Sequence, residues 1–186
     1  MAAEFRFNTG RLALALPATV RRRASLAQDV LSRAGAPARW LREAGLVKEL
    51  LDLSVAQERE LVKLRKAIQL IADALVGSQP LPHREVGVLN KAASYPIAVP
   101  QLDAKSGQSK VVASDPFEAA LAAIARDAID LVTGPLRDRI KACEQDDCRV
   151  LFLDTSRSAR RRWCSMDRCG SRAKGETFRL RHREER

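Results

Sequence analysis

Cys143-Glu-Gln-Asp-Asp-Cys148, followed after fifteen residues by Cys164-Ser-Met-Asp-Arg-Cys169, contains every cysteine of the 186-residue chain. Four residues separate the cysteines within each pair, and two such thiolate pairs can together form a tetrahedral zinc site. Four protein ligands leave no open position for water or a substrate, which distinguishes a structural zinc site from a catalytic one. We therefore predict that a structural Zn2+ is bound by Cys143, Cys148, Cys164 and Cys169.

The alternative interpretation of these cysteines is disulfide bonds or unrelated free thiols. Disulfides are typical of secreted proteins, and residues 1–8 have neither the basic start nor the apolar run of a secretory signal. Charges or prolines interrupt every apolar run, so no stretch has the uncharged length of a membrane span. We expect a cytoplasmic protein with no membrane partner, whose paired cysteines bind metal.

The residues around the cysteines predict a small module made of a β-hairpin and a helix. Residues 149–153 have a strand pattern, residues 154–158 form a turn, and residues 159–163 can return antiparallel to the second pair. Cysteines five positions apart lie about 140 degrees apart on an ideal helix. We therefore place Cys164 at the end of the hairpin and Cys169 at the turn that begins a basic helix, residues 171–182. This order is typical of a treble-clef-like zinc module.

Positive charge is concentrated in and beyond the second cysteine pair. The net charge is +10, and residues 155–183 contain ten basic residues against two acidic ones. Arginine suits phosphate oxygens, and such contacts position a protein on DNA without reading its sequence. Few aromatic residues are available to stack on bases, so duplex DNA is the expected partner. The candidate contacts are Arg157, Arg160, Arg161, Arg162, Arg172, Lys174 and Arg179.

Two of these residues, Arg172 and Lys174, lie near the start of the basic helix and are best placed to read base edges, although a phosphate contact suits them equally. The same charges could instead only solvate the module or bind an acidic protein. The alternative function is therefore a zinc-stabilised protein interaction module that binds no nucleic acid. We do not expect an enzyme, because the sequence has no phosphate-binding glycine loop, nucleophile elbow or His-Glu metal motif.

The sequence upstream of the cysteines predicts several helices and one hairpin. Ser54 and Gln57 form a capping-box signature for a long helix that ends near residue 76. Asp115-Pro116 begins a helix that ends near residue 132. Shorter helices are predicted at residues 37–41, ended by Gly45, and at residues 84–93, and an antiparallel hairpin at residues 97–102 and 110–113.

Two features near the N-terminus are less regular. Residues 5–16 alternate loosely in polarity, which predicts two short strands or one bent strand. Arg21, Arg22 and Arg23 form a charge run, interpreted either as a second phosphate contact or as a solvated loop or helix start. The expected fold class is α+β. A mostly helical domain with small antiparallel β elements at residues 1–135 precedes the zinc module at residues 136–186, and the short linker between them predicts that the two parts touch.

The run from Cys143 to Lys174, with its Arg161-Arg162-Trp163-Cys164 and Cys169-Gly-Ser-Arg172 segments, resembles the CGNR zinc finger family. Residues 10–14 and 40–46 and Leu89-Asn90 are similar to the ABATE domain that precedes this finger. The resemblance implies a bacterial stress-induced transcription regulator. Our hypothesis is that its N-terminal domain forms a homodimer or senses a signal such as a small-molecule effector. Ser171 stands where the family name places asparagine, and either residue can cap a helix.

Overall fold

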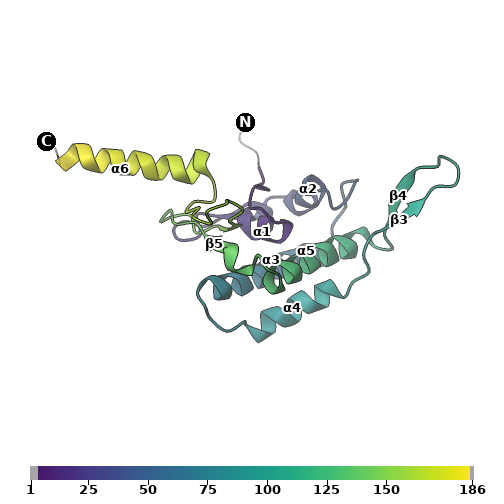
Figure 1. Ribbon diagram of the computed structural model, residues 1–186. Coiled ribbons are helices and arrows are strands. Elements are labelled where there is room, and N and C mark those ends of the chain that lie inside the picture. The colour runs from purple at the N-terminus through teal and green to yellow at the C-terminus, as the bar shows by residue number, and fades with distance from the viewer. Residues whose placement is uncertain (1–3, 185–186) are drawn as a thin grey trace.

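The computed structural model describes residues 4–184, without the side chains of Thr177, Leu180 and residues 181–184 (Figure 1). The predicted charges of Arg181 and Arg183 therefore lie outside the described side chains. The α-helices are α1 Leu12–Ala15, α2 Ala36–Glu43, α3 Val55–Val76, α4 His83–Ala93, α5 Pro116–Thr133 and α6 Ser171–Glu184. The single turns are η1 Pro17–Thr19, η2 Val30–Ser32, η3 Arg137–Arg139 and η4 Met166–Gly170, the last a π-helix.

The strands form three antiparallel two-stranded sheets. They are β1 Val20–Arg21 with β2 Gln28–Asp29, β3 Val99–Leu102 with β4 Ser109–Val112, and β5 Ile140–Ala142 with β6 Leu151–Leu153. The predicted α+β class, mostly helical with small antiparallel elements, is confirmed.

The core of the N-terminal part lies between α3, α4 and α5. The Ser54 hydroxyl accepts a hydrogen bond from the Gln57 amide at 3.3 Å, and the Gln57 side chain accepts one from the Ser54 amide at 2.9 Å. This capping box and the buried positions Leu61, Leu64 and Ile68 confirm the predicted long helix. Each fully buried side chain of this type contributes about 1.5–3 kcal/mol to folding.

The start of α5 is also as predicted. The Asp115 carboxylate accepts hydrogen bonds from the Phe117 and Glu118 amides at 2.7 and 3.1 Å. At its other end the Gly134 amide donates to the Asp130 carbonyl at 2.8 Å. The helices predicted near Trp40 and at residues 84–93 are present as α2 and α4.

The predicted strands at residues 5–16 are wrong, because this segment contains α1 instead. Ala13, Leu14 and Ala15 are all buried, so the alternation of side chains does not separate a buried face from an exposed one. The Asp127 carboxylate of α5 accepts a hydrogen bond from the Ala13 amide at 2.7 Å and pairs with Arg11 at 2.8 Å. Contacts with a helix more than 100 residues away therefore fix the conformation of this segment.

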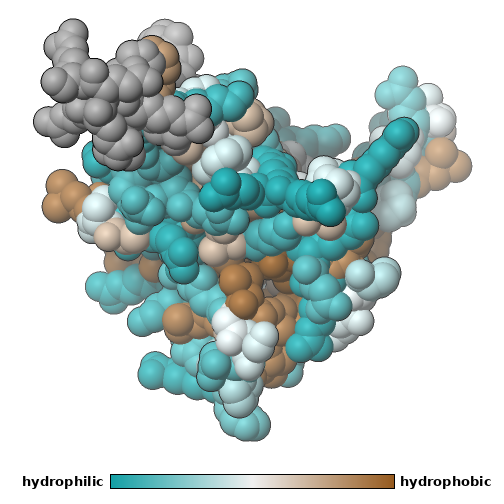
Figure 2. Space-filling model, turned by 60° about the vertical axis from the view of Figure 1, so that its left-hand side comes forward, coloured by the Kyte–Doolittle hydropathy of each residue, from teal (hydrophilic) through white to brown (hydrophobic). Residues whose placement is uncertain are grey.

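The β3–β4 hairpin confirms the prediction for residues 97–113 and stands away from the helices (Figure 1). Its apolar side chains are exposed, with 76% of Leu102 and 58% of Val111 accessible to solvent. Figure 2 shows hydrophobic side chains on this projecting arm, at the upper right of the view.

The hairpin predicted inside the cysteine module is wrong in one of its strands, because residues 159–163 are not the partner of β6. β6 pairs with β5, so that Ile140 lies opposite Leu153, whereas residues 159–163 form no strand. The first cysteine pair consequently lies in the connection between the two strands.

The two parts of the chain share a core, as the short linker predicted. Leu14, Ala72 and Leu131 of the helical part pack with Ile140, Leu151 and Leu153 of the hairpin. The Leu153 amide also donates to the Thr9 carbonyl at 2.8 Å. The cysteine module is therefore fixed against the helical part, although α6 projects beyond it (Figure 1).

Candidate metal centre

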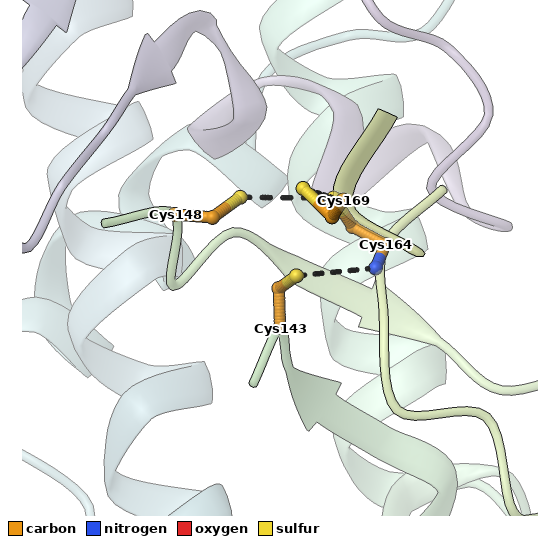
Figure 3. Close-up of side chains that lie close together, drawn as sticks. All are labelled: Cys143, Cys148, Cys164 and Cys169. Atoms are coloured by element: carbon orange, nitrogen blue, oxygen red, sulfur yellow. Dashed lines mark hydrogen bonds between the residues drawn. The ribbon is translucent and has the colours of Figure 1, made fainter. Parts of the chain in front are cut away.

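The four cysteines come together at one buried point. Cys143 and Cys148 lie in the connection between β5 and β6, Cys164 follows the loop after β6, and Cys169 lies in η4, directly before α6. All four are buried, and their sulfur atoms lie within 4.8 Å of one another. Figure 3 shows the side chains converging from these separate segments. The placement of Cys169 at the turn that begins the basic helix is as predicted.

Local backbone bonds shape the first cysteine pair. The Cys143 amide donates to the Val150 carbonyl at 2.9 Å, and the Cys148 amide donates to the Gln145 carbonyl at the same distance. Arg149 has a positive φ of 52°, which turns the chain sharply from Cys148 into β6. The result is a tight loop that directs both thiols to the same side.

The geometry of the sulfur atoms fits a zinc ion. With zinc–sulfur bonds of about 2.3 Å, a tetrahedral site holds its sulfur atoms about 3.8 Å apart. The Sγ atom of Cys164 lies 3.7 Å from that of Cys148 and 3.6 Å from that of Cys169. None of the four cysteines is in a disulfide, so all four can act as thiolate ligands.

The electrostatics of the cluster also favour a cation. Hydrogen bonds from the Cys148 and Cys164 thiols lower the pKa of the Cys143 thiol to about 3. The pKa of Cys164 is raised, because its thiol is held as a donor to Cys143 and Cys148 and because it is buried. Without a metal the cluster would therefore hold a mixture of thiols and thiolates, whereas a dication allows all four sulfur atoms to be anionic.

Arg172 contacts the metal centre directly. Its guanidinium lies 3.6 Å from the Cys169 sulfur and 3.0 Å from the Asp147 carboxylate. The pKa of Arg172 is raised, chiefly by Asp147 and then by Cys169. Such a contact orients a ligand and compensates its charge, so Arg172 supports the site in addition to any contact with DNA.

Arg161 is another predicted DNA contact that the structure places inside the module. Its backbone amide donates to the Asp154 carboxylate at 2.8 Å, and its side chain donates to the Trp163 and Cys164 carbonyls. The guanidinium also lies 4.7 Å from the centre of the Phe152 ring. These contacts hold the loop that carries Cys164.

The remaining predicted contacts are exposed. Arg162 pairs with Glu144 at 2.5 Å and lies over the Trp163 ring. The other members of the predicted set are on the surface around the loop and along α6: Arg157, Arg160, Lys174 and Arg179. Ser171 is exposed too, and its hydroxyl donates to the Met166 carbonyl at 3.0 Å, which is the local backbone contact expected of it.

Sequence reasoning missed the role of Asp154, which we assigned only to a turn. Its side chain is fully buried and accepts hydrogen bonds from Ser156, the Arg161 amide and Lys141, the last at 2.8 Å. Burial alone would raise the pKa of Asp154, but these donors lower it. The available signal was an aspartate directly after a buried strand, with a serine two residues later.

The arginine run near the N-terminus has a role that neither interpretation anticipated. Arg22 pairs with Asp147 at 3.1 Å, in the loop between Cys143 and Cys148. Arg23 donates to the Arg149 carbonyl at 2.9 Å and pairs with Asp73 of α3 at 2.5 Å. These arginines therefore join the cysteine loop to the helical part.

The fold and the site define a class of protein in which a mostly helical α+β domain is joined to a four-cysteine zinc finger. The chain belongs to the ABATE family, whose model matches residues 10–135 under the description "Putative stress-induced transcription regulator". A model of the CGNR zinc finger matches residues 139–182. The resemblance seen in the sequence is confirmed, and the finger match together with the four clustered cysteines identifies structural zinc as the cofactor.

These two families are of the regulatory and zinc finger types. None of the curated proteins compared with the chain matches it significantly. Within the described residues, no helix combines the length and the apolar character needed to cross a membrane.

Proposed function

We propose that the protein is a transcription regulator in which zinc bound by Cys143, Cys148, Cys164 and Cys169 folds a basic module that binds duplex DNA. The observation that carries the proposal is the closed cluster of four buried sulfur atoms at the base of a positively charged loop and helix. Metal binding stabilises zinc-finger peptides by about 10–16 kcal/mol, which is enough to order a module of this size.

The exposed cations divide into two groups on this module. Arg157 and Arg160 lie on the loop between β6 and the second cysteine pair, and Lys174 and Arg179 lie on α6. Exposed arginine and lysine are free to reach phosphate oxygens, whereas Arg161 and Arg172 also have internal contacts. The loop and α6 together form the proposed DNA-binding surface.

The remaining parts of the proposal concern the N-terminal domain, residues 1–135, and the setting in the cell. The exposed apolar side chains of the β3–β4 hairpin support a homodimer formed through this domain. The description of the family supports a response to stress, and we place the regulator in the cytoplasm with no catalytic activity of its own.

Fluorescence anisotropy of a labelled duplex with the zinc-loaded full chain tests the proposal. If about five phosphates are neutralised, the logarithm of affinity falls with the logarithm of salt concentration with a slope of roughly −4 to −5. Replacing both Arg157 and Arg160 with alanine weakens binding to every duplex and makes the slope shallower by about 2. Arg42→Ala is the control, because Arg42 is exposed on α2, remote in sequence from the module.

Absence of DNA binding at low salt contradicts the proposal. The alternative is an interaction module for an acidic protein. It is supported by the ion pair between Arg162 and Glu144, because this surface already binds a carboxylate there. Copurification of a defined acidic partner, sensitive to the Arg157 and Arg160 substitutions, together with failed DNA binding, is the result that favours this alternative.

A further inference from the structure

A cavity of about 700 Å3 lies between the N-terminal segment and the start of α6. Pockets for small ligands typically have volumes of about 300–1,000 Å3. The N-terminal part lines it with residues 6, 21, 22 and 28, η4 with residues 167–169, and α6 with residues 171, 172, 175, 176 and 179. Both parts of the chain therefore contribute to this cavity, which adjoins the metal centre at Cys169.

The lining is strongly positive. Six arginines contribute to it against two carboxylates, Asp167 and Glu176; the arginines are Arg6, Arg21, Arg22, Arg168, Arg172 and Arg179. Glu176 is held by the Gln145 amide at 3.2 Å. Asp147 pairs with both Arg22 and Arg172, so these two cations are already partly neutralised.

Three of the arginines form no ion pair with a carboxylate among the described side chains. The Nε atoms of Arg6, Arg21 and Arg168 are buried and have no hydrogen-bond acceptor among the described residues. Buried polar atoms are normally paired, and each one left unpaired is costly to folding. The side chain of Arg21 donates only to the Glu4 carbonyl among the hydrogen bonds found in residues 4–184.

Arg6 and Arg168 both lie close enough to Arg21 for their charges to repel it. The pKa of Arg21 is lowered, first by burial and then by the charges of Arg6 and Arg168. Like charges brought together in a half-buried position are unfavourable unless an anion lies between them. This arrangement is common at sites that bind phosphoryl groups, where several guanidinium groups donate to the same set of oxygens.

We propose that this cavity binds a small, multiply charged oxyanion, such as the phosphoryl group of a free metabolite. Arg6, Arg21 and Arg168 donate to its oxygens. A free anion suits half-buried guanidinium groups better than a duplex does, because the phosphates of DNA lie on a broad convex surface. The binding itself does not depend on the proposed function.

A consequence rests on the proposed function. Since the anion contacts both the N-terminal part and η4, it stabilises one placement of the zinc module against the helical part. An anion that changes the affinity for DNA must have its own affinity changed by DNA to the same extent.

Isothermal titration calorimetry of the zinc-loaded full chain with sodium pyrophosphate tests this site, at ionic strength held constant with chloride. Zinc content is measured before and after each titration, because pyrophosphate also binds metal ions. The parent and the Arg42→Ala control bind with the same affinity. The Arg6→Ala/Arg168→Ala variant binds at least roughly tenfold more weakly, because charge-assisted hydrogen bonds are among the strongest in proteins.

Folding of the variant is checked by its thermal midpoint. Removing two cations that repel Arg21 leaves the midpoint without pyrophosphate equal or higher, whereas pyrophosphate raises the midpoint of the parent and not that of the variant. Failure of the parent to bind, or equal binding by the variant, overturns the proposal.

The duplex DNA titration distinguishes a free anion from the phosphates of DNA as the occupant of the cavity. If the cavity takes a free anion, the Arg6→Ala/Arg168→Ala variant binds DNA like the parent when no pyrophosphate is present. A loss of DNA affinity as large as that of the Arg157 and Arg160 double variant, without a loss of pyrophosphate binding, assigns the cavity to DNA and contradicts the proposal. DNA binding that fails in parent and variant alike, with pyrophosphate binding intact, rejects only the proposed function.

Discussion

Arg172 shows how one side chain can connect the metal centre to the rest of the molecule. It contacts the Cys169 sulfur and shares the Asp147 carboxylate with Arg22. A chain of contacts therefore runs from a metal ligand to the N-terminal arginine run. The role of Arg172 in reading bases stays a prediction, whereas its contact with a ligand suggests a second effect that can be measured separately.

We predict that Arg172→Ala lowers the affinity for zinc by about tenfold, because residues that support a metal ligand typically contribute 10–100-fold to affinity. Competition with a chromogenic chelator measures the change. Arg137→Ala is a matched control, since Arg137 is an exposed arginine in η3. Equal zinc retention by the two variants would show that the contact with Cys169 has no effect on the metal.

Tyr95 offers a residue-scale test of the helical part. Its hydroxyl donates to the Glu60 carboxylate of α3 at 2.6 Å, which raises the pKa of Tyr95 to about 12 from the ordinary 10.0. Because the folded state holds this proton more tightly, the contribution to stability is complete below about pH 10 and is lost as pH rises through 12.

Absorbance at a phenolate wavelength reports this group alone, because Tyr95 is the single tyrosine of the chain. We predict that Glu60→Gln shifts the titration toward the ordinary pKa. The substitution removes the charge that opposes ionisation but preserves a hydrogen-bond acceptor. A titration unchanged by Glu60→Gln would contradict the contact.

At the scale of elements, helix starts were predictable because their signals are local. Ser54 with Gln57 and Asp115 with Pro116 each specify a cap within four residues, and both caps are present. The cysteine spacing was equally informative, since only four residues between two ligands limit how far apart the two sulfur atoms of each pair can be.

Strand pairing was harder to predict, because it depends on distant contacts. The partner of β6 lies before the first cysteine pair. After β6, the Ser156 and Arg161 amides donate hydrogen bonds to the buried Asp154 carboxylate, which fold this segment back around Asp154. Residues 159–163 therefore cannot pair with β6. Likewise α1 is determined by Asp127 of α5, which no pattern within residues 5–16 could indicate.

A glycine tests the contact between the N-terminal segment and β6. Gly10 has a φ of 87°, and a Cβ atom there would lie 3.0 Å from the Cβ of Leu153. We predict that Gly10→Ala destabilises the protein by about 1–3 kcal/mol in urea unfolding, since both backbone strain and crowding oppose it.

Gly87 in α4 is the matched control. An added Cβ there meets nothing within 4 Å, so Gly87→Ala stabilises the protein by about 0.5–1 kcal/mol. Equal effects of the two substitutions would mean that the close approach of Gly10 to Leu153 is absent in solution.

At the scale of the whole molecule, the zinc module and the helical part are physically coupled. They share a core that includes Leu14, Leu131 and Leu151. In addition, Arg22 binds Asp147 and Arg23 binds the Arg149 carbonyl, which holds the cysteine loop against the helical part. Composition and charge predicted the two parts and the location of the positive charge. The short linker predicted that the two parts touch, but not which residues do so, because these contacts join residues far apart in the sequence, such as Leu14 with Leu151 and Arg22 with Asp147.

The zinc content of the purified, carefully reduced full chain tests the central claim most directly. We predict a ratio of about one zinc ion per chain by elemental analysis, because four thiolates complete one tetrahedral site. Cys148→Ser should lower that ratio while the other three cysteines remain. A ratio well below one in the reduced parent protein would contradict the account.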